Sequence, residues 1–451
     1  MLRKYLLHPL LAATALSLSI PALADTQEQT ATDPATDNAA EQVVDIQQEL
    51  PLQDLRTFTE IFERIRSSYV EEIDDHTLFN NAIKGMLSSL DPHSAYLQEE
   101  DFSDLQENTS GKFGGLGIEV GMENGLVRVI SPIDDTPAQR AGIRAGDLIV
   151  TLDKEPVMGM SLNDAVSRMR GEPGTEISLE VRREGESELL SFTLERAEIK
   201  VASVRTDVLS GDIGYIRITQ FQEKTGRELE KALQNWKDTS NLNGLILDLR
   251  NNPGGVLQAA VGVVDSFVSD GLIVYTKGRN PMSEMSYSAD AVTVFPEMPL
   301  VVLINGGSAS ASEIVAGALQ DHKRAVIVGT RSFGKGSVQT VLPVSETAAV
   351  KLTTARYFTP NGRSIQAQGI VPDIVIEQSE VTPSEQRFFK ESDLPGHLEN
   401  PNGDGKEKAE AKADKREDDL IRRDFQLYEA HTLLRGLSIL SPLKKNTEVA
   451  E

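Results

Sequence analysis

The sequence contains no cysteine and has a large deficit of positive charge. The missing thiols exclude disulfide bonds, thiolate nucleophiles and cysteine-based zinc sites. The formal net charge is −24, because 69 acidic side chains outnumber 45 basic ones. Such a surface argues against binding to nucleic acid or to anionic lipid. No cluster of His, Asp and Glu has the spacing of metal ligands, so we expect neither a metal nor a cofactor.

Beyond its N-terminus the sequence has no apolar run long enough to span a membrane. At the N-terminus, two basic residues precede an apolar stretch over 6–20, and small residues occupy positions 22 and 24. This order predicts a secretory signal peptide that is cleaved before Asp25. An uncleaved membrane anchor is the alternative, but the stretch is short, Pro9 interrupts it and Pro21 directly follows it. We therefore expect a periplasmic protein, with membrane association as the alternative.

A serine-rich turn carries the first functional signal. The apolar stretch 300–304 predicts a buried strand of a parallel sheet. Apolar residues then recur from Ala311 to Leu319 with the period of an amphipathic helix. Ser310 is the middle of three serines in the turn between them, where the unpaired N–H groups of a helix N-terminus can hold an oxyanion. A serine before a helix is also a common N-cap, and taken alone the cap is the simpler interpretation.

The second signal is the segment 331–339, which reads Arg-Ser-Phe-Gly-Lys-Gly-Ser-Val-Gln. Lys335 and Gln339 are four residues apart, so an extended backbone places both on one face. A lysine acts as a general base only when its pKa is lowered, and Phe333 and Val338 are the apolar neighbours expected to bury it. Gln339 would then orient the lysine by accepting one of its hydrogen bonds. A solvated loop lysine is the ordinary alternative.

Together, the segments 305–313 and 331–339 resemble the carboxyl-terminal processing proteases. The resemblance extends from about residue 50 to about residue 380, over most of the mature chain. It implies that Ser310 is the nucleophile, that Lys335 is the general base and that Gln339 orients the lysine.

The resemblance also implies an oxyanion hole with two N–H donors. One is the amide of Ala311, directly after the nucleophile. The other comes from the segment 248–255, Asp-Leu-Arg-Asn-Asn-Pro-Gly-Gly. Gly254 and Gly255 both remain candidates for this second donor.

The histidines offer a weaker alternative. A Ser–His–Asp triad would have to use His322 beside Asp321, about one helix length beyond Ser310. Adjacent residues on a helix do not face each other, so this triad is disfavoured. His93, in a short Asp-Pro-His-Ser motif, is expected to have a packing or capping role.

Residues 111–199 resemble a PDZ domain. The segment 114–118, Gly-Gly-Leu-Gly-Ile, is expected to be its carboxylate-binding loop, in which successive N–H groups bind the terminal carboxylate of a peptide. Arg170 matches a position that, in the family, couples the position of the PDZ domain to the state of the active site. A PDZ fold that only packs internally is the alternative. The residues expected to bind the substrate tail are Gly115, Leu116, Gly117, Ile118 and Arg170.

The resemblance implies an α/β fold with a helical N-terminal segment, a PDZ domain, a ClpP/crotonase-like α/β protease core and a C-terminal helical segment. The C-terminal apolar helix is expected to pack on the N-terminal helices or on a second subunit. The expected regions are a signal peptide (1–24), a disordered tether (25–47), an N-terminal helical region (48–110), a PDZ domain (111–199), a catalytic core (200–380), and a charged linker with a C-terminal helical, oligomerisation region (381–451).

The expected function is an exported serine endopeptidase that binds unstructured, apolar C-terminal tails and cleaves them by a Ser–Lys mechanism. Its substrates are expected to be periplasmic proteins such as cell-wall hydrolases, by analogy with the family. Two alternatives remain: a PDZ scaffold or chaperone with an inactive core, and a latent protease that needs an adaptor protein. A homo-oligomer is expected, and nucleic acid is not an expected partner.

Overall fold

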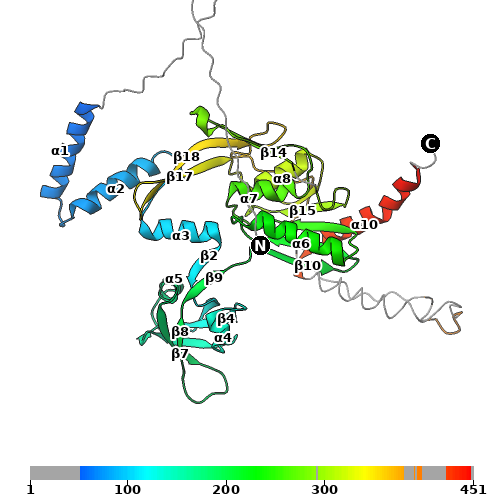
Figure 1. Ribbon diagram of the computed structural model, residues 1–451, viewed down its shortest axis with the longest axis horizontal. Coiled ribbons are helices and arrows are strands. Elements are labelled where there is room, and N and C mark those ends of the chain that lie inside the picture. Colours follow the sequence, from blue (N-terminus) through cyan, green and yellow to red (C-terminus); the bar gives the residue numbers. More distant parts are fainter. Residues whose placement is uncertain (1–50, 291–292, 380–390, 392–393, 399–422, 448–451) are drawn as a thin grey trace, which may run out of the picture. The chain divides into compact units, whose positions relative to one another are not determined.

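The computed structural model places two compact units, Met1–Ile73 and Asp74–Glu451. The expected signal peptide and tether, and most of the charged linker, lie outside the described residues. None of the helices within the described ranges is long and apolar enough to cross a membrane. The described residues are 51–290, 293–379, 391, 394–398 and 423–447 (Figure 1).

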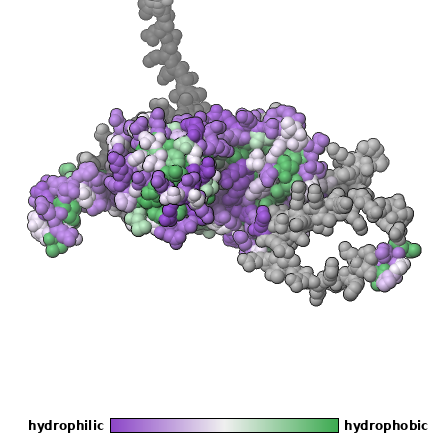
Figure 2. Space-filling view, turned by 90° about the horizontal axis from the view of Figure 1, so that it is seen from below, coloured by the Kyte–Doolittle hydropathy of each residue, from purple (hydrophilic) through white to green (hydrophobic). Residues whose placement is uncertain are grey.

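Helix α1 (Leu52–Ser68) is the described helix of the first unit. The rings of Phe58 and Phe62 lie against each other on it, with centroids 6.5 Å apart. No residue of α1 is buried, and large apolar side chains including Leu52 and Ile61 are more than half exposed. The helix therefore presents an uncovered apolar face. Elsewhere, hydrophilic residues cover much of the face seen in Figure 2, with apolar patches between them.

The second unit begins with α2 (Asp75–Ser88) and α3 (Glu99–Ser110), and continues into an antiparallel sheet over 118–195. The strand order of this sheet is β3-β4-β5-β7-β8, with β6 paired to β5. It has a hydrophobic core of its own, which includes Val127, Val129 and Ile149. The bounds are β3 (Ile118–Glu123), β4 (Leu126–Pro132), α4 (Pro137–Arg140), β5 (Leu148–Leu152), β6 (Glu155–Pro156), α5 (Leu162–Met169), β7 (Glu176–Arg182) and β8 (Leu190–Glu195). The flanking strands β2 (Lys112–Gly115) and β9 (Ala197–Lys200) pair with each other.

The next segment is built on a six-stranded sheet in the order β10-β11-β12-β15-β16-β19. Neighbouring strands from β11 onward are parallel, and β10 is antiparallel to β11. The strand expected over 300–304 and the helix expected from Ala311 are both present, as β15 and α8. The bounds are β10 (Val204–Leu209), β11 (Ile213–Ile218), α6 (Thr225–Thr239), β12 (Gly244–Asp248), α7 (Leu257–Asp265), β15 (Leu300–Ile304), α8 (Ala311–Asp321), β16 (Val326–Gly329) and β19 (Ile374–Val375).

Helices cover both faces of this sheet. Successive side chains of a strand point to opposite faces. Val302 and Ile304 accordingly pack with α6, α7 and α8 in the larger core. Val301 and Leu303 pack in a second cluster with α10 (Phe425–Thr447), on the opposite face (Figure 1). Burial on both faces explains why these strands are continuous apolar runs in the sequence.

Helix α10 corrects one expectation. Its residues Leu427, Ala430 and Leu434 pack on the chain's own parallel sheet, rather than on the N-terminal helices or on a second subunit. The reason is that the sheet has a second apolar face, which no other described helix covers. The prediction was therefore wrong for the first part of α10.

A buried ion pair fixes the start of α10. Arg250 donates two hydrogen bonds to Asp248, of 3.0 and 2.7 Å, and two to Asp424, of 2.8 and 2.6 Å. Burial opposes ionisation of Asp248, but the hydrogen bonds and charges of Arg250 and Arg217 outweigh it and lower the pKa of this carboxyl. The segment after β12 is thus tied to the C-terminal helix.

Helix α8 differs from the expected amphipathic pattern, because every residue from Ala311 to Leu319 is buried. Its small residues Ala316 and Gly317 allow close contacts on the side that the periodic pattern assigned to solvent. Gly317 is one such position, since a Cβ there would lie 2.9 Å from Thr359. The turn that contains Ser310 is therefore held by a helix enclosed on all sides.

A second, antiparallel sheet brings distant segments beside the first. Its order is β1-β18-β13-β14, and β17 also pairs with β18. Through the pairing of Ala95 with Lys351, the N-terminal segment lies against β18. The bounds are β1 (Ala95–Leu97), β13 (Gly271–Gly278), the 3-10 helix η1 (Pro281–Ser283), β14 (Ser286–Ala289), β17 (Ser337–Pro343) and β18 (Ala349–Phe358).

Candidate active site

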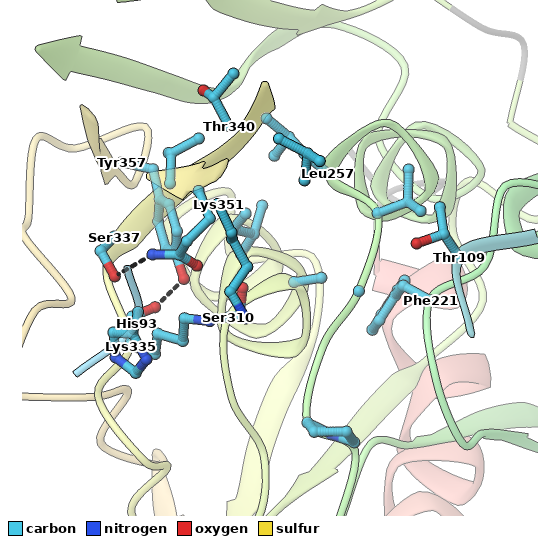
Figure 3. A pocket seen from close by; sticks show the side chains of 18 of the residues that line it. His93, Thr109, Phe221, Leu257, Ser310, Lys335, Ser337, Thr340, Lys351 and Tyr357 are labelled. Carbon is cyan, nitrogen blue, oxygen red and sulfur yellow. Dashed lines mark hydrogen bonds between the residues drawn. The ribbon is translucent and has the colours of Figure 1, made fainter. Parts of the chain in front are cut away.

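Ser310 occupies a strained position between β15 and α8. It is the N-cap of α8, with φ 55° and ψ −113°. A non-glycine residue rarely adopts this conformation, and strain of this kind is characteristic of functional sites. The side chain lines a cavity of about 600 Å³ that Lys335 also lines (Figure 3). The structure therefore brings the two residues singled out in the sequence to one cavity.

The two serines that flank Ser310 have structural roles. The hydroxyl of Ser308 donates to the Leu249 carbonyl at 2.9 Å, and that of Ser312 donates to the Asn252 carbonyl at 2.9 Å. The Ala309 amide also donates to the Asn252 carbonyl, at 3.0 Å. These bonds join the turn around Ser310 to the loop that follows β12, and they leave Ser310 as the serine that faces the cavity.

The loop after β12 presents one of its two glycine amides to the cavity. The Gly254 N–H is occupied, because it donates to the side chain of Asn252 at 2.9 Å. The amides of Gly255 and Ala311 have no hydrogen-bond acceptor within the described chain, and both residues line the cavity. Gly254 instead allows the loop after β12 to lie close to the Ser310 turn, since a Cβ at residue 254 would lie 2.7 Å from the Cβ of Ser310. Gly255 is therefore the better placed of the two candidates.

Glu313 is a buried carboxylate that joins the two predicted segments. It accepts hydrogen bonds from the amides of Ser310 (2.8 Å), Lys335 (2.8 Å) and Gly334 (2.6 Å), and from the Ser332 hydroxyl (2.6 Å). In the sequence, Glu313 lies in the first turn of the expected helix, where a negative charge is favourable. Its actual role, which depends on a loop twenty residues later, was not visible in the sequence.

Lys335 lies in the loop before β17, with its side chain in the cavity wall (Figure 3). Burial lowers its pKa, and the positive charge of Lys351 lowers it further. The negative charges of Glu313 and Asp91 act in the opposite direction without reversing the shift. The expected burial by Phe333 is wrong, because that ring is 63% exposed, whereas Val338 does pack against the core.

Gln339 also lines the cavity, but it does not contact the lysine in the expected way. Its amide donates to the hydroxyls of Ser337, at 3.0 Å, and Thr353, at 3.3 Å. Among the described residues no hydrogen bond joins Gln339 to Lys335. The extended-backbone argument fails because β17 begins only at Ser337 and its pairing with β18 shifts register just before Gln339.

The N-terminal segment contributes part of the cavity wall. Asp91 caps the turn, accepting the amides of His93 (2.8 Å) and Ser94 (2.9 Å), and it also accepts the Thr353 hydroxyl at 3.2 Å. His93 therefore does not cap; it lines the cavity near Lys335. Burial, followed by the charge of Lys335, lowers the pKa of His93. His322 lies elsewhere and contacts the Leu272 carbonyl.

The expected carboxylate-binding loop lies between β2 and β3. The carbonyl oxygens of Leu116 and Gly117 accept hydrogen bonds from Ala138 and Ile133. The amides of the same two residues have no acceptor within the described part of the chain. Gly117 has φ 75°, and a Cβ there would collide with Thr136 at 2.3 Å, so glycine is required.

Arg170 lies at the end of α5, and α3 engages its guanidinium. It pairs with Glu107 at 2.7 Å and Asp104 at 3.3 Å, and it stacks over Phe113 at 4.9 Å. Burial raises the pKa of Glu107, although Arg170 partly offsets the shift. Since α3 also supplies cavity residues, including Thr109, Arg170 connects the antiparallel domain to the cavity wall.

Comparisons with known proteins agree with this architecture. Residues 212–376 match peptidase family S41, residues 114–194 match the PDZ domain, and residues 12–101 match the N-terminal domain of the activating protease CtpB. A carboxy-terminal-processing protease of Bartonella bacilliformis is 49% identical over 85% of this chain and 88% of its own length. The protease CtpB of Bacillus subtilis is 38% identical over 70% of this chain and 66% of its own.

A solved structure, the photosystem II D1 C-terminal processing protease, shares 32% sequence identity and covers 73% of this chain and 94% of its own, with a TM-score of 0.43. The family matches make this protein a serine-type peptidase with a PDZ domain. At the identity and coverage of the Bartonella relative, the chain belongs to the carboxy-terminal processing protease family.

Replacing Glu313 with Gln should disrupt the site without changing the size of the side chain. One of its two oxygens becomes an NH₂ donor that faces N–H donors, so buried hydrogen bonds to a charged group are lost. We expect the free energy of unfolding to fall by about 2–3 kcal/mol, measured by urea denaturation, together with most peptidase activity. Glu230→Gln, at an exposed residue of α6, is the matched control, and equal behaviour of the two variants would contradict the role of Glu313.

Proposed function

We propose that this protein hydrolyses peptide bonds with Ser310 as the nucleophile and Lys335 as the general base. The observation that carries the proposal is a strained serine and a lysine of lowered pKa in one cavity. Neutral Lys335 accepts the hydroxyl proton while the Ser310 oxygen bonds to the substrate carbonyl carbon. The protonated lysine then gives this proton to the leaving amine as the peptide bond breaks. In the second half of the reaction, Lys335 accepts a proton from water as the water oxygen bonds to the acyl carbon, and it returns this proton to the Ser310 oxygen as the ester bond breaks.

The oxyanion of the tetrahedral intermediate is stabilised by the N–H groups of Ala311 and Gly255. Free amides at a helix N-terminus and on an adjacent loop provide donors that are already oriented. The occupied amide of Gly254 supports Gly255 as the second donor. Gln339 supports the site indirectly, because its contacts with Ser337 and Thr353 hold the strands that carry the lysine loop.

The substrate is an unstructured protein tail with an apolar C-terminus, which the PDZ domain binds. The unoccupied amides of Leu116 and Gly117 support recognition of a terminal carboxylate. Val256, Leu257 and Ile314 give the cavity an apolar wall near Ser310, which suits an apolar residue at the cleavage point. A PDZ scaffold with an inactive core is less consistent with the strain retained at Ser310.

Three further features support the location, the assembly and the regulation that we propose for the enzyme. The pattern over 1–24 supports export to the periplasm, where proteins such as cell-wall hydrolases are candidate substrates. The uncovered apolar face of α1 supports a homo-oligomer. The ion pairs of Arg170 support control through the PDZ domain by a substrate tail or an adaptor protein.

Purified mature protein should cleave an unfolded substrate with an apolar C-terminus, and both Ser310→Ala and Lys335→Ala should reduce kcat/KM by at least about a thousandfold. Circular dichroism should show that both variants remain folded. Lys323→Ala, at an exposed lysine beyond α8, is the control and should retain activity. Undiminished cleavage by Ser310→Ala would refute the mechanism.

Tail recognition should depend on the free carboxylate. With the inactive Ser310→Ala protein, a peptide with an apolar C-terminus should bind about ten times more tightly as the free acid than as the C-terminal amide, because charge-assisted hydrogen bonds are lost. Isothermal titration of the two peptides measures this ratio. Equal affinities would show that the loop over 115–118 does not bind the terminal carboxylate.

The charge of Lys351 should set the pH range of activity. Because this charge lowers the pKa of Lys335, Lys351→Gln should raise that pKa. The increase of kcat/KM with pH should then move to higher pH, and activity at pH 7 should fall. Lys351→Arg preserves the charge and should keep the wild-type profile. Identical pH profiles for the Gln variant and the wild type would show that the lysines do not interact.

A further inference from the structure

Asn252 is a buried residue in the loop after β12, and the proposed mechanism gives its side chain no role. The residue is 0% exposed. Its side-chain nitrogen donates to the carbonyl of Ile218, at the end of β11, at 2.9 Å. Its side-chain oxygen accepts the amide of Gly254, also at 2.9 Å. One side chain therefore fastens the first glycine of the loop to the neighbouring strand.

The backbone of Asn252 joins the same loop to the turn that carries the nucleophile. Its carbonyl oxygen accepts the amide of Ala309 at 3.0 Å and the hydroxyl of Ser312 at 2.9 Å. These two donors lie on either side of Ser310 and Ala311 in the chain. Asn252 therefore connects the segment of the first oxyanion donor to the loop of the second.

The peptide group between Gly254 and Gly255 is held by the backbone of Phe221, a residue of the cavity wall (Figure 3). The Gly254 carbonyl accepts the Phe221 amide at 2.9 Å, and the Val256 amide donates to the Phe221 carbonyl at 2.8 Å. In a trans peptide group the C=O and N–H bonds point in opposite directions. The Gly255 N–H therefore points away from the Phe221 amide and keeps no partner within the described chain.

Two successive glycines need restraint to hold this arrangement. Gly254 has φ 103° and Gly255 has φ 140°, and a glycine changes its backbone conformation at little steric cost. Rotation of their shared peptide group would place a carbonyl oxygen where the N–H donor belongs. The bond from the Gly254 amide to Asn252 fixes the preceding peptide group, which limits this rotation.

We infer that Asn252 is a positioning residue for the oxyanion hole, which sets the Gly255 N–H beside the Ala311 N–H. The inference rests on the proposed function, in which these two amides stabilise the oxyanion. The two segments lie close together, since a Cβ on Gly254 would lie 3.0 Å from the Ala311 nitrogen. Asn252 exchanges no proton, and it acts on the transition state only through the donor that it places.

Asn252→Ala removes both side-chain bonds and allows a direct test. Loss of an oxyanion donor costs about a hundred- to thousandfold in rate, so we expect kcat/KM to fall at least about tenfold when the donor is displaced. A peptide trifluoromethyl ketone supplies a second readout. The Ser310 oxygen adds to its carbonyl carbon, the hydroxyl proton passes to Lys335, and the carbonyl oxygen becomes an oxyanion. The inhibition constant should rise by the same factor as kcat/KM falls.

Binding of an uncleaved tail should not change, because the ground state has no oxyanion. A peptide with an apolar C-terminus should bind Ser310→Ala and the double variant Ser310→Ala/Asn252→Ala with affinities within about twofold of each other. Isothermal titration measures both. A general loss of structure would weaken this binding as well, so the comparison separates positioning from folding.

Ile246→Val is the control for stability. Ile246 is 0% exposed on β12, the strand that leads into the loop. The substitution removes one buried methylene group and so lowers stability, but it leaves the hydrogen bonds of the loop in place. It should keep the wild-type kcat/KM and inhibition constant.

Asn252→Asp provides the test if the alanine variant does not fold. It keeps an oxygen that accepts the Gly254 amide and loses the NH₂ donor to Ile218. We expect kcat/KM to fall by about three- to tenfold, less than in Asn252→Ala, with a parallel rise of the inhibition constant.

The outcomes separate the inference from the function on which it rests. Wild-type kcat/KM in a folded Asn252 variant, with Ser310→Ala inactive, would overturn the inference alone. A fall of kcat/KM that leaves the inhibition constant of the ketone unchanged would also overturn it, because the loss would then not concern the oxyanion. Cleavage by Ser310→Ala at the wild-type rate would overturn the proposed function and the inference together.

Discussion

The geometry of the site depends on the buried carboxylate of Glu313. Its oxygens accept donors from the turn that carries Ser310 and from the loop that carries Lys335. A buried carboxylate is tolerated only when such donors surround it, because burial of an unpaired charge is costly. The same requirement forces the two loops together, so the hydrogen bonds that satisfy Glu313 also bring Ser310 and Lys335 to one cavity.

Around this carboxylate, the cavity is assembled from segments far apart in the sequence. The parallel sheet places the Ser310 turn and the loop after β12 side by side, because β12 and β15 are parallel neighbours whose carboxyl ends meet. The antiparallel sheet then adds β17, β18 and the N-terminal segment. Polar side chains join these segments: Asn252 donates to the Ile218 carbonyl at the end of β11, and both Asp91 and Gln339 bond to Thr353 of β18. The cavity is therefore a product of both sheets.

The sequence predicted the strand over 300–304, the helix α8, and Ser310 and Lys335 as members of one site, because these depend on local periodicity and on a specific motif. It did not predict which groups would surround the lysine. Phe333 is exposed although apolar, and Tyr357 is a site residue although it sits in an ordinary-looking strand. Periodicity shows which face of an element is apolar, but the partner on that face is chosen by tertiary contacts. Polar residues within the strand β18, such as Lys351 and Thr353, were the available signal.

The docking of α10 has a consequence for how the chain is made. Val301 and Leu303 stay uncovered on one face of the parallel sheet until the ribosome has added Leu434. Arg250, beside the loop with Gly255, likewise lacks the carboxylate of Asp424 until then. A nascent chain that stops earlier exposes an apolar sheet face, which favours aggregation or capture by a chaperone. The region around Arg250 therefore takes its final form only after α10 has packed on the sheet.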